Sequence, residues 1–115
     1  MTEEGRFQSK IKNWLKEQDI YDLKQNASAL SKTGAPDRIL CIHGVFIGME
    51  IKKNNLEKAS LLQQYNILEI KKNGGIAFVI RPDTFKKFKE ITLEFLEDRD
   101  LSKYKQNIEH YMEVK

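Results

Sequence analysis

The sequence predicts an α/β fold in which helices pack on the faces of a mixed β-sheet. Two observations carry this prediction. Apolar residues recur at helical spacing in the first, third and last parts of the chain, and short β-rich runs lie between these segments. The expected order is α-β-β-β-α-β-α-α, and elements in such an order pack in layers around a shared core. A length of 115 residues fits one domain, with a core at about residues 3–97 and an extra helix at about 101–113.

The N-terminal part of the chain predicts a helix, a short strand and a loop. The helix covers residues 3–18, and Thr2 can cap its N-terminus. Its apolar stripe consists of Phe7, Ile11, Trp14 and Leu15. Residues 21–26 form the expected strand, and residues 27–35 lack periodicity and end at Pro36, which predicts a loop.

The middle of the chain predicts a β-hairpin. Two β-rich runs, 37–42 and 45–52, flank the turn pair His43-Gly44. Side chains alternate along a strand, so the second run has two distinct faces. One face carries Val45, Ile47, Met49 and Ile51; the other carries Phe46, Gly48, Glu50 and Lys52.

The rest of the chain predicts three helices and one strand. A helix opens at Ser60 and stops at Gly74-Gly75, and residues 76–80 form a compact apolar strand. Pro82-Asp83 starts a third helix, and a fourth amphipathic helix begins at Leu101. The inward residues of the last two helices are expected to be Phe85, Phe88, Ile91 and Phe95, then Leu101, Tyr104, Ile108 and Tyr111.

The hairpin register predicts a cluster of charged groups. If His43-Gly44 is the turn, Ile42 pairs with Val45, and the same register sets Asp37 opposite Glu50. Cβ atoms in opposed positions lie about 4.5–5.5 Å apart, so these carboxylates need a shared proton or a cation. Oxygen ligands select a hard ion, Mg²⁺ or Mn²⁺, and a main-chain oxygen such as that of Ile51 can complete the shell. The alternative is a turn aspartate beside a solvated edge strand.

Composition excludes several classes of protein. The chain has no run of about 18 apolar residues that could span a membrane, and its first six residues are acidic and polar, unlike a secretory signal. Cys41 is the single cysteine, and we expect it to be a small buried residue rather than a ligand. The net charge of +3 does not by itself indicate a nucleic-acid binder. We expect an intracellular protein.

Several short motifs together resemble those of the VRR-NUC (virus-type replication-repair nuclease) family of the PD-(D/E)xK nuclease superfamily. They are Gly34-x-Pro36-Asp37, twelve intervening residues, Glu50-Ile51-Lys52, Ser60-x-x-Gln63 and Gly74-Gly75. The resemblance covers the chain from the first helix to about Phe85. It implies a PD-(D/E)xK nuclease-like mixed sheet flanked by helices, with metal-binding Asp37 and Glu50, catalytic Lys52 and a bordering Gln63.

Two of the implied roles have structural alternatives. Members of the family also use a glutamate of the first helix, and here Glu4 fits better than Glu3, which stays open. Glu4 could instead only favour its helix N-terminus, as acidic residues do. Gln63 could serve only as a helix cap, since Ser60 and Gln63 form an S-x-x-Q capping box.

The resemblance implies a Mg²⁺- or Mn²⁺-dependent DNA endonuclease. Water would attack the phosphodiester, and the metal and Lys52 would stabilise the developing charge. The expected substrate is branched, Holliday-junction-like or otherwise structured DNA, and the expected setting is phage or prophage replication, recombination or repair. A homodimer is expected, with the helix from Leu101 as its interface or as a cap on the core. The alternatives are a DNA-binding module that does not cleave and a generic α/β interaction protein.

Phosphate contacts require cations around such a site. The candidates are Lys24, Lys32, Arg38 and Lys53, of which Lys32 is preferred because it lies on the loop before Asp37. The basic residues of segment 81–89 are interpreted as a solvated helix face.

Overall fold

The computed structural model describes residues 2–25 and 33–112. Within these ranges the observed element order is the predicted one. The elements are α1 (Glu3–Glu17), β1 (Tyr21–Lys24), β2 (Arg38–Ile42), β3 (Val45–Ile51), α2 (Leu61–Lys72), β4 (Ile76–Ile80), α3 (Phe85–Asp98) and α4 (Leu101–Tyr111). Most of the predicted loop 27–35 lies outside the described residues. No helix in the described ranges is long and apolar enough to cross a bilayer.

The four strands form one mixed sheet in the order β1-β2-β3-β4. The first two pairings are antiparallel, and β3 pairs with β4 in parallel. Across the hairpin, Ile42 pairs with Val45 and Arg38 with Met49, which confirms the predicted register. His43 and Gly44 both have positive φ angles, 51° and 80°, as the favoured two-residue hairpin turn requires.

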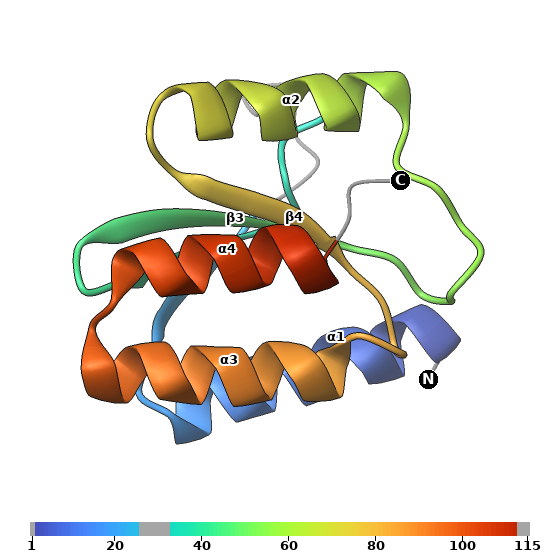
Figure 1. Ribbon diagram of the computed structural model, residues 1–115. Helices are drawn as coiled ribbons and strands as arrows, with labels where there is room; N and C mark the ends of the chain where they lie inside the picture. The colour runs from blue at the N-terminus through green and yellow to red at the C-terminus, as the bar shows by residue number, and fades with distance from the viewer. Residues whose placement is uncertain (1, 26–32, 113–115) are drawn as a thin grey trace.

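Three helices cover one face of the sheet, and a single helix covers the other (Figure 1). On the first face, side chains of α1, α3 and α4 pack with β2, β3 and β4 into one large core. Its fully buried aromatic residues are Phe78, Phe88, Phe95 and Tyr104. On the second face α2 makes a small core, formed by Ala59, Ile67, Ala77 and Val79. This face is therefore covered only in part.

The local starts and stops of the helices follow the predicted chemistry. The Thr2 side chain accepts a hydrogen bond from the N–H of Gly5 at 3.0 Å and caps α1. Gly74 ends α2 with a φ angle of 90°, in the left-handed region that favours glycine. Of the two roles considered for the last helix, the structure shows the second, since Tyr104 and Ile108 of α4 are buried in the large core.

Two expectations about burial are wrong. Cys41 is exposed, because it lies on the part of the second sheet face that α2 does not reach, between Tyr21 of β1 and Phe46 of β3. Tyr111 is 40% exposed, and Met112, just after α4, takes the buried position in the core instead.

Candidate functional site

The chemistry-bearing residues of the hairpin meet on the sheet face that α2 covers. Asp37 comes directly before β2, while Glu50 lies near the end of β3 and Lys52 just after it. The N–H of Ile51 donates to Asp37 Oδ2 at 2.8 Å, which fixes the aspartate beside β3. The two carboxyl groups are close enough for the negative charge of Asp37 to raise the pKa of Glu50. The structure thus brings Asp37, Glu50 and Lys52 together.

The surroundings of Glu50 raise the pKa of its carboxyl group. Its side chain lies under the α2 layer, and the residue is only 3% exposed. Burial, followed by the negative charge of Asp37, raises the pKa of Glu50 from 4.5 to about 8, against the opposing positive charge of Lys52. Of the two outcomes that close carboxylates allow, the raised pKa of Glu50 favours retention of a proton on Glu50 when no cation is bound.

One oxygen of Glu50 has no hydrogen-bond partner among the described residues. Oε1 is buried and accepts no hydrogen bond from any described residue, although a buried carboxyl oxygen normally has a donor or a cation beside it. Such an orphaned oxygen next to a second carboxylate fits a hard divalent cation. No group of three or more His, Cys, Asp or Glu side chains that could hold a metal occurs in the described residues. Two carboxylates suffice for Mg²⁺ where substrate phosphate oxygens and water complete the shell.

Lys52 is held in place by several groups. Its main-chain N–H donates to the Ile80 carbonyl at 3.0 Å, which ties the end of β3 to the end of β4. Its Nζ atom donates to Gln63 Oε1 at 2.9 Å. The same ammonium lies 3.6 Å from Glu50 Oε2 and 3.7 Å from Glu57 Oε1. The lysine side chain is 8% exposed, so its charge is presented from a defined position rather than from a free surface chain.

Gln63 caps α2 and also contacts Glu50 and Lys52. In the capping box, Ser60 Oγ accepts from the Gln63 N–H at 3.1 Å, and Gln63 Oε1 accepts from the Ser60 N–H at 2.8 Å. The same side chain donates from Nε2 to Glu50 Oε2 at 3.0 Å. One amide therefore starts α2 and also orders Glu50 and Lys52.

The segment before Asp37 is seated tightly on α2. Gly34 has a φ angle of 82°, and a Cβ atom there would lie 2.6 Å from Leu62 Cγ and 3.0 Å from the Leu62 carbonyl carbon. The buried Asn66 side chain donates to the carbonyl of Thr33 at 3.2 Å and to that of Leu62 at 2.9 Å. These contacts fix the path by which the chain reaches Asp37.

Sheet and helix also approach closely at Gly48. A Cβ atom at Gly48 would lie 2.8 Å from Ile70 Cδ1 and 2.9 Å from Pro36 Cγ. The absence of a side chain therefore lets Pro36 and α2 rest on β3. Gly34 and Pro36, which precede Asp37, are therefore explained by their packing against α2 and β3, whether or not the site has a chemical role.

The predicted glutamate of the first helix is not grouped with this cluster. Glu4 is exposed in the first turn of α1, where Gln8 Nε2 donates to its Oε1 at 3.4 Å. Glu3 is exposed in the same turn. The structure adds neither residue to the carboxylate pair of Asp37 and Glu50.

The residues predicted to contact phosphate are exposed, buried or outside the described residues. Lys24 and Lys53 are exposed, as a role in DNA binding requires. Lys32 lies outside the described residues. Arg38 is buried and forms an ion pair with Asp22. It pairs with Met49, whose side chain is in the large core, so Arg38 points to the sheet face opposite Glu50 and is not available to a phosphate there.

Two further residues of the site are absent from the sequence-based set. Glu57 lies in the connection from β3 to α2, and its main-chain oxygen accepts from Arg81 Nη2 at 2.9 Å. No motif spacing indicates Glu57, because the shape of a loop brings it to Lys52. Asn66 had a signal: it follows Gln63 by three residues, so two polar side chains share the inner side of an otherwise apolar helix turn.

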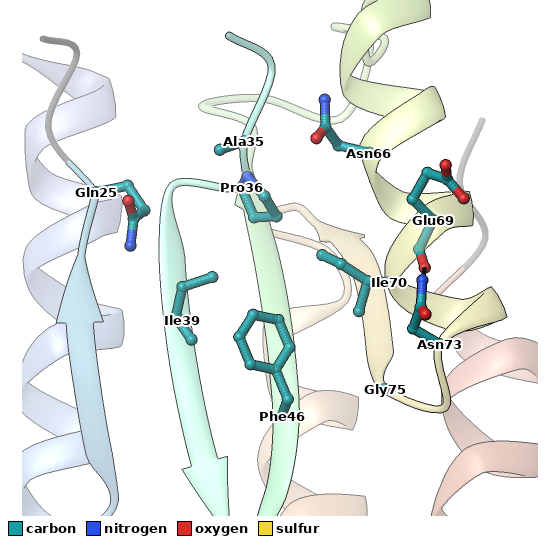
Figure 2. A pocket seen from close by; sticks show the side chains of 10 residues that line it. All are labelled: Gln25, Ala35, Pro36, Ile39, Phe46, Asn66, Glu69, Ile70, Asn73 and Gly75. Atoms are coloured by element: carbon teal, nitrogen blue, oxygen red, sulfur yellow. Dashed lines mark hydrogen bonds between the residues drawn. The ribbon is translucent and has the colours of Figure 1, made fainter. Parts of the chain in front are cut away.

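A cavity of about 520 Å³ lies next to the site, between the sheet and α2. Figure 2 shows apolar side chains lining it from both sides, including Pro36, Ile39, Phe46 and Ile70. Glu69 is the one acidic residue of the lining. The cavity therefore offers shape and apolar surface, whereas the ionisable cluster lies beyond its lining.

Comparisons with known proteins agree with this fold. No family model matches the sequence, and a search of curated proteins gave no match. Among solved structures, one described as a VRR_NUC domain is 26% identical, with a TM-score of 0.68, and the match covers 83% of this chain and 99% of that one. A second, described as a VRR_NUC domain protein, is 21% identical with a TM-score of 0.60, over 99% of this chain and 91% of that one, and shows the shared fold. The chain is therefore similar to VRR_NUC domains in fold, and to the first of these also weakly in sequence.

Proposed function

We propose that this chain, with the fold and the motif residues of a VRR-NUC protein, is a metal-dependent DNA endonuclease. The observation that carries the proposal is the state of Glu50: a buried carboxyl group beside Asp37, with one oxygen lacking any partner among the described residues. A purely structural carboxylate in such a place would be expected to have its lone pairs satisfied. A site that receives a cation leaves that oxygen open.

Each residue of the cluster has a role in the proposal. Asp37 and Glu50 hold the cation, and the main-chain oxygen of Ile51 is a further candidate ligand. Mg²⁺ or Mn²⁺ bound there would polarise a phosphoryl oxygen and acidify a water. Lys52 places its ammonium where negative charge develops on the phosphate. Gln63 keeps Glu50 and Lys52 in their relative positions, as its two hydrogen bonds support.

The substrate proposal is structured duplex DNA. The candidate phosphate contacts are the exposed Lys24 and Lys53 together with Lys32, and contacts of this kind position DNA without reading its sequence. Selectivity would then come from the shape of the DNA, as in branched or Holliday-junction-like molecules, and from two copies of the chain acting on two strands. The proposed setting is phage or prophage replication, recombination or repair inside a bacterial cell. Glu4, although exposed, remains the candidate that could approach when DNA binds.

A cleavage assay tests the proposal. Linear, nicked and four-way-junction DNA of one sequence are incubated with the protein in Mg²⁺, in Mn²⁺ or in a chelator. We expect cleavage only with the cation and fastest on the junction. Asp37→Ala and Lys52→Ala should each lower the rate by at least about 100-fold, because each removes a direct contribution to charge stabilisation. Lys16→Ala, an exposed lysine of α1, is the matched control and should cut like the unaltered chain.

A second readout separates metal binding from cleavage. Calorimetric titration with Mn²⁺ should show binding to the unaltered chain and to Lys52→Ala, and none to the double variant Asp37→Ala/Glu50→Ala. A chain that binds junction DNA but cuts none of the three substrates with either cation is instead the non-cleaving DNA-binding module. Cleavage that survives Asp37→Ala would show that the carboxylate pair is not the site.

A further inference from the structure

A second cavity lies at the end of the molecule where β3 and β4 finish. Its volume is about 380 Å³, and its walls come from the connection between β3 and α2, the segment after β4 and the end of α4. Figure 1 shows these parts at one end of the molecule, where α2 and α3 also begin. The lining residues that bear on its chemistry are Leu56, Lys58, Arg81, Asp83, His110 and Tyr111. The cavity therefore has its own ionisable, aromatic and apolar groups, distinct from the carboxylate pair.

This second cavity adjoins the ionisable cluster. The N–H of Lys52 donates to the carbonyl of Ile80 at 3.0 Å, and the next residue, Arg81, lines the cavity. Arg81 Nη2 also donates to the Glu57 carbonyl at 2.9 Å, and Glu57 Oε1 lies 3.7 Å from Lys52 Nζ. Both chain neighbours of Glu57 line the cavity. A DNA strand held at Lys52 can therefore extend into it.

The wall formed by the connection between β3 and α2 is braced by hydrogen bonds. Asn54 Oδ1 accepts from the N–H groups of Leu56 and Glu57 at 2.9 and 2.8 Å. Asn55 Oδ1 accepts from the Asp83 N–H at 3.0 Å, which ties the connection to the segment after β4. Leu56 is nevertheless 87% exposed. A single exposed leucine is common, but one that a braced loop holds at a cavity is in position to contact whatever enters.

The end of α4 brings an aromatic ring to the same cavity. Tyr111 is 40% exposed, and the His110 ring lies edge-on to it with the ring centroids 4.5 Å apart. Lys87 Nζ lies 4.7 Å from the centroid of the Tyr111 ring. Exposed aromatic rings beside cations are the groups that bind single-stranded nucleic acid, because the bases stack on the rings and the phosphates are negative.

The charge and the size of the cavity agree with such a ligand. Lys58 and Arg81 outnumber Asp83, the one acidic residue of the lining, and His110 adds a positive charge when it is protonated. Lys58 and His110 are both exposed, as contact with a phosphate requires. The volume of about 380 Å³ lies in the range of about 300–1,000 Å³ that small-ligand sites have. One nucleotide fits such a space, and a duplex does not.

We propose that this cavity binds one nucleotide of an unpaired DNA strand, with the base against Tyr111 and Leu56 and the phosphate at Lys58. The inference rests on the proposed function and deepens it, because the strand is the one whose phosphodiester lies at Lys52. An intact duplex must unpair and unstack a base before the base can enter, whereas DNA that is already unpaired at a branch does not have to. The cavity therefore contributes selectivity for branched over linear DNA.

The test is the affinity of the chain for a fluorescent deoxythymidine strand of about ten nucleotides, measured by anisotropy in a chelating buffer. Tyr111→Ala should raise the dissociation constant about tenfold, whereas Tyr111→Phe keeps the ring and should stay within about twofold. Leu56→Ser, on the other wall, should raise it about threefold. Leu93→Ser is the matched control, since Leu93 is an exposed leucine of α3 outside the lining, and should bind like the unaltered chain.

A strand without bases separates stacking from a change in structure. The unaltered chain should bind an abasic strand of the same length about tenfold or more weakly, and Tyr111→Ala should lower that affinity no further. Thymidine monophosphate should bind more weakly than the deoxythymidine strand, because it lacks the neighbouring phosphates. Circular dichroism should show all variants folded, and Leu56→Ser tests the cavity without altering α4.

Three outcomes overturn the inference. They are an unaltered chain that does not bind the strand, variants of Tyr111 and Leu56 that bind it equally well, and an equal loss in Tyr111→Ala with the abasic strand. Affinity for thymidine monophosphate equal to that for the strand would also overturn it and assign the cavity to a free nucleotide. Cleavage without any effect of Tyr111 on strand binding removes this inference and keeps the proposed function. Strand binding that depends on Tyr111, in a chain that cuts no DNA, does the reverse.

Discussion

The two faces of the sheet differ in how completely they are covered. On one face α1, α3 and α4 bury the large aromatic residues in a continuous core. On the other face α2 makes a small core, and beside it lie a cavity, exposed apolar side chains and the pair of half-buried Asp37 and buried Glu50. The closed face holds most of the apolar burial that stabilises a domain. The open face has close backbone contacts at Gly34 and Gly48, a buried oxygen of Glu50 without a partner among the described residues, and a cavity. These are features that a binding or catalytic site requires.

The largest expected effect tests which face stabilises the fold. Phe88 of α3 is fully buried, whereas Phe46 of β3 is 48% exposed on the open face. We expect Phe88→Ala to lower the free energy of unfolding by about 3–5 kcal/mol and Phe46→Ala by less than about 1 kcal/mol. Urea denaturation of both variants measures the difference. Equal losses would show that the open face contributes as much to stability as the closed one.

A smaller loss is expected where the open face holds the approach to Asp37. Gly34→Ala introduces a side chain at a positive φ angle and within contact of the α2 backbone. The free energy of unfolding should fall by about 1–3 kcal/mol, and Mn²⁺ should bind more weakly because Asp37 is displaced. Gly44→Ala is the control: its φ angle is also positive, but nothing lies within 4 Å of the added Cβ. Gly44→Ala should lower the free energy of unfolding but leave Mn²⁺ binding unchanged. Unchanged metal binding in Gly34→Ala would disprove the link to Asp37.

The raised pKa of Glu50 predicts a pH dependence of the stability of the metal-free protein. The folded state raises the pKa of Glu50 from 4.5 to about 8, so it binds the proton more tightly than the unfolded chain does. The resulting stability is complete below pH 4.5 and is lost as the pH rises through 8. In a chelating buffer, the unaltered chain should lose about 1–3 kcal/mol of unfolding free energy between pH 5 and 8 that Glu50→Gln retains. Parallel curves for the two proteins would contradict the shift.

The smallest effect separates the two tasks of Gln63. Ser60→Ala removes the cap alone and should cost about 1 kcal/mol of unfolding free energy, with cleavage nearly unchanged. Gln63→Ala removes the reciprocal cap bond at a similar cost, and also the hydrogen bonds to Glu50 and Lys52. Its cleavage rate should therefore fall by about tenfold or more under conditions where both variants are fully folded. Equal activity of the two would mean that Gln63 only caps the helix.

Local chemistry made the hairpin and the helix cap predictable from sequence. The turn pair His43-Gly44 sets the register, and the register brings Asp37 beside β3. Strand alternation then places Glu50 and Lys52 on one face. The capping-box pattern likewise predicts that Gln63 folds back onto the start of its helix. These features depend on neighbours within about fifteen residues in the chain.

Features that depend on distant packing were not predictable. The hairpin register sets the side on which Arg38 lies, but its charge is satisfied there by Asp22 of a distant strand, and the exposure of Cys41 follows from where α2 stops. Glu57 reaches Lys52 because Arg81, which follows β4, fixes the intervening loop. Neither residue spacing nor composition contains the path of that loop.

The double use of Gln63 has a consequence for how this sequence can change over time. A substitution at this position affects two properties on which selection can act: the start of α2 and the arrangement of Glu50 and Lys52. A lineage that lost the chemistry would still keep an S-x-x-Q pattern for as long as α2 needs its cap. The glutamine alone is therefore a poor marker of an active member, and the retention of Glu50 and Lys52 beside it is the informative sign.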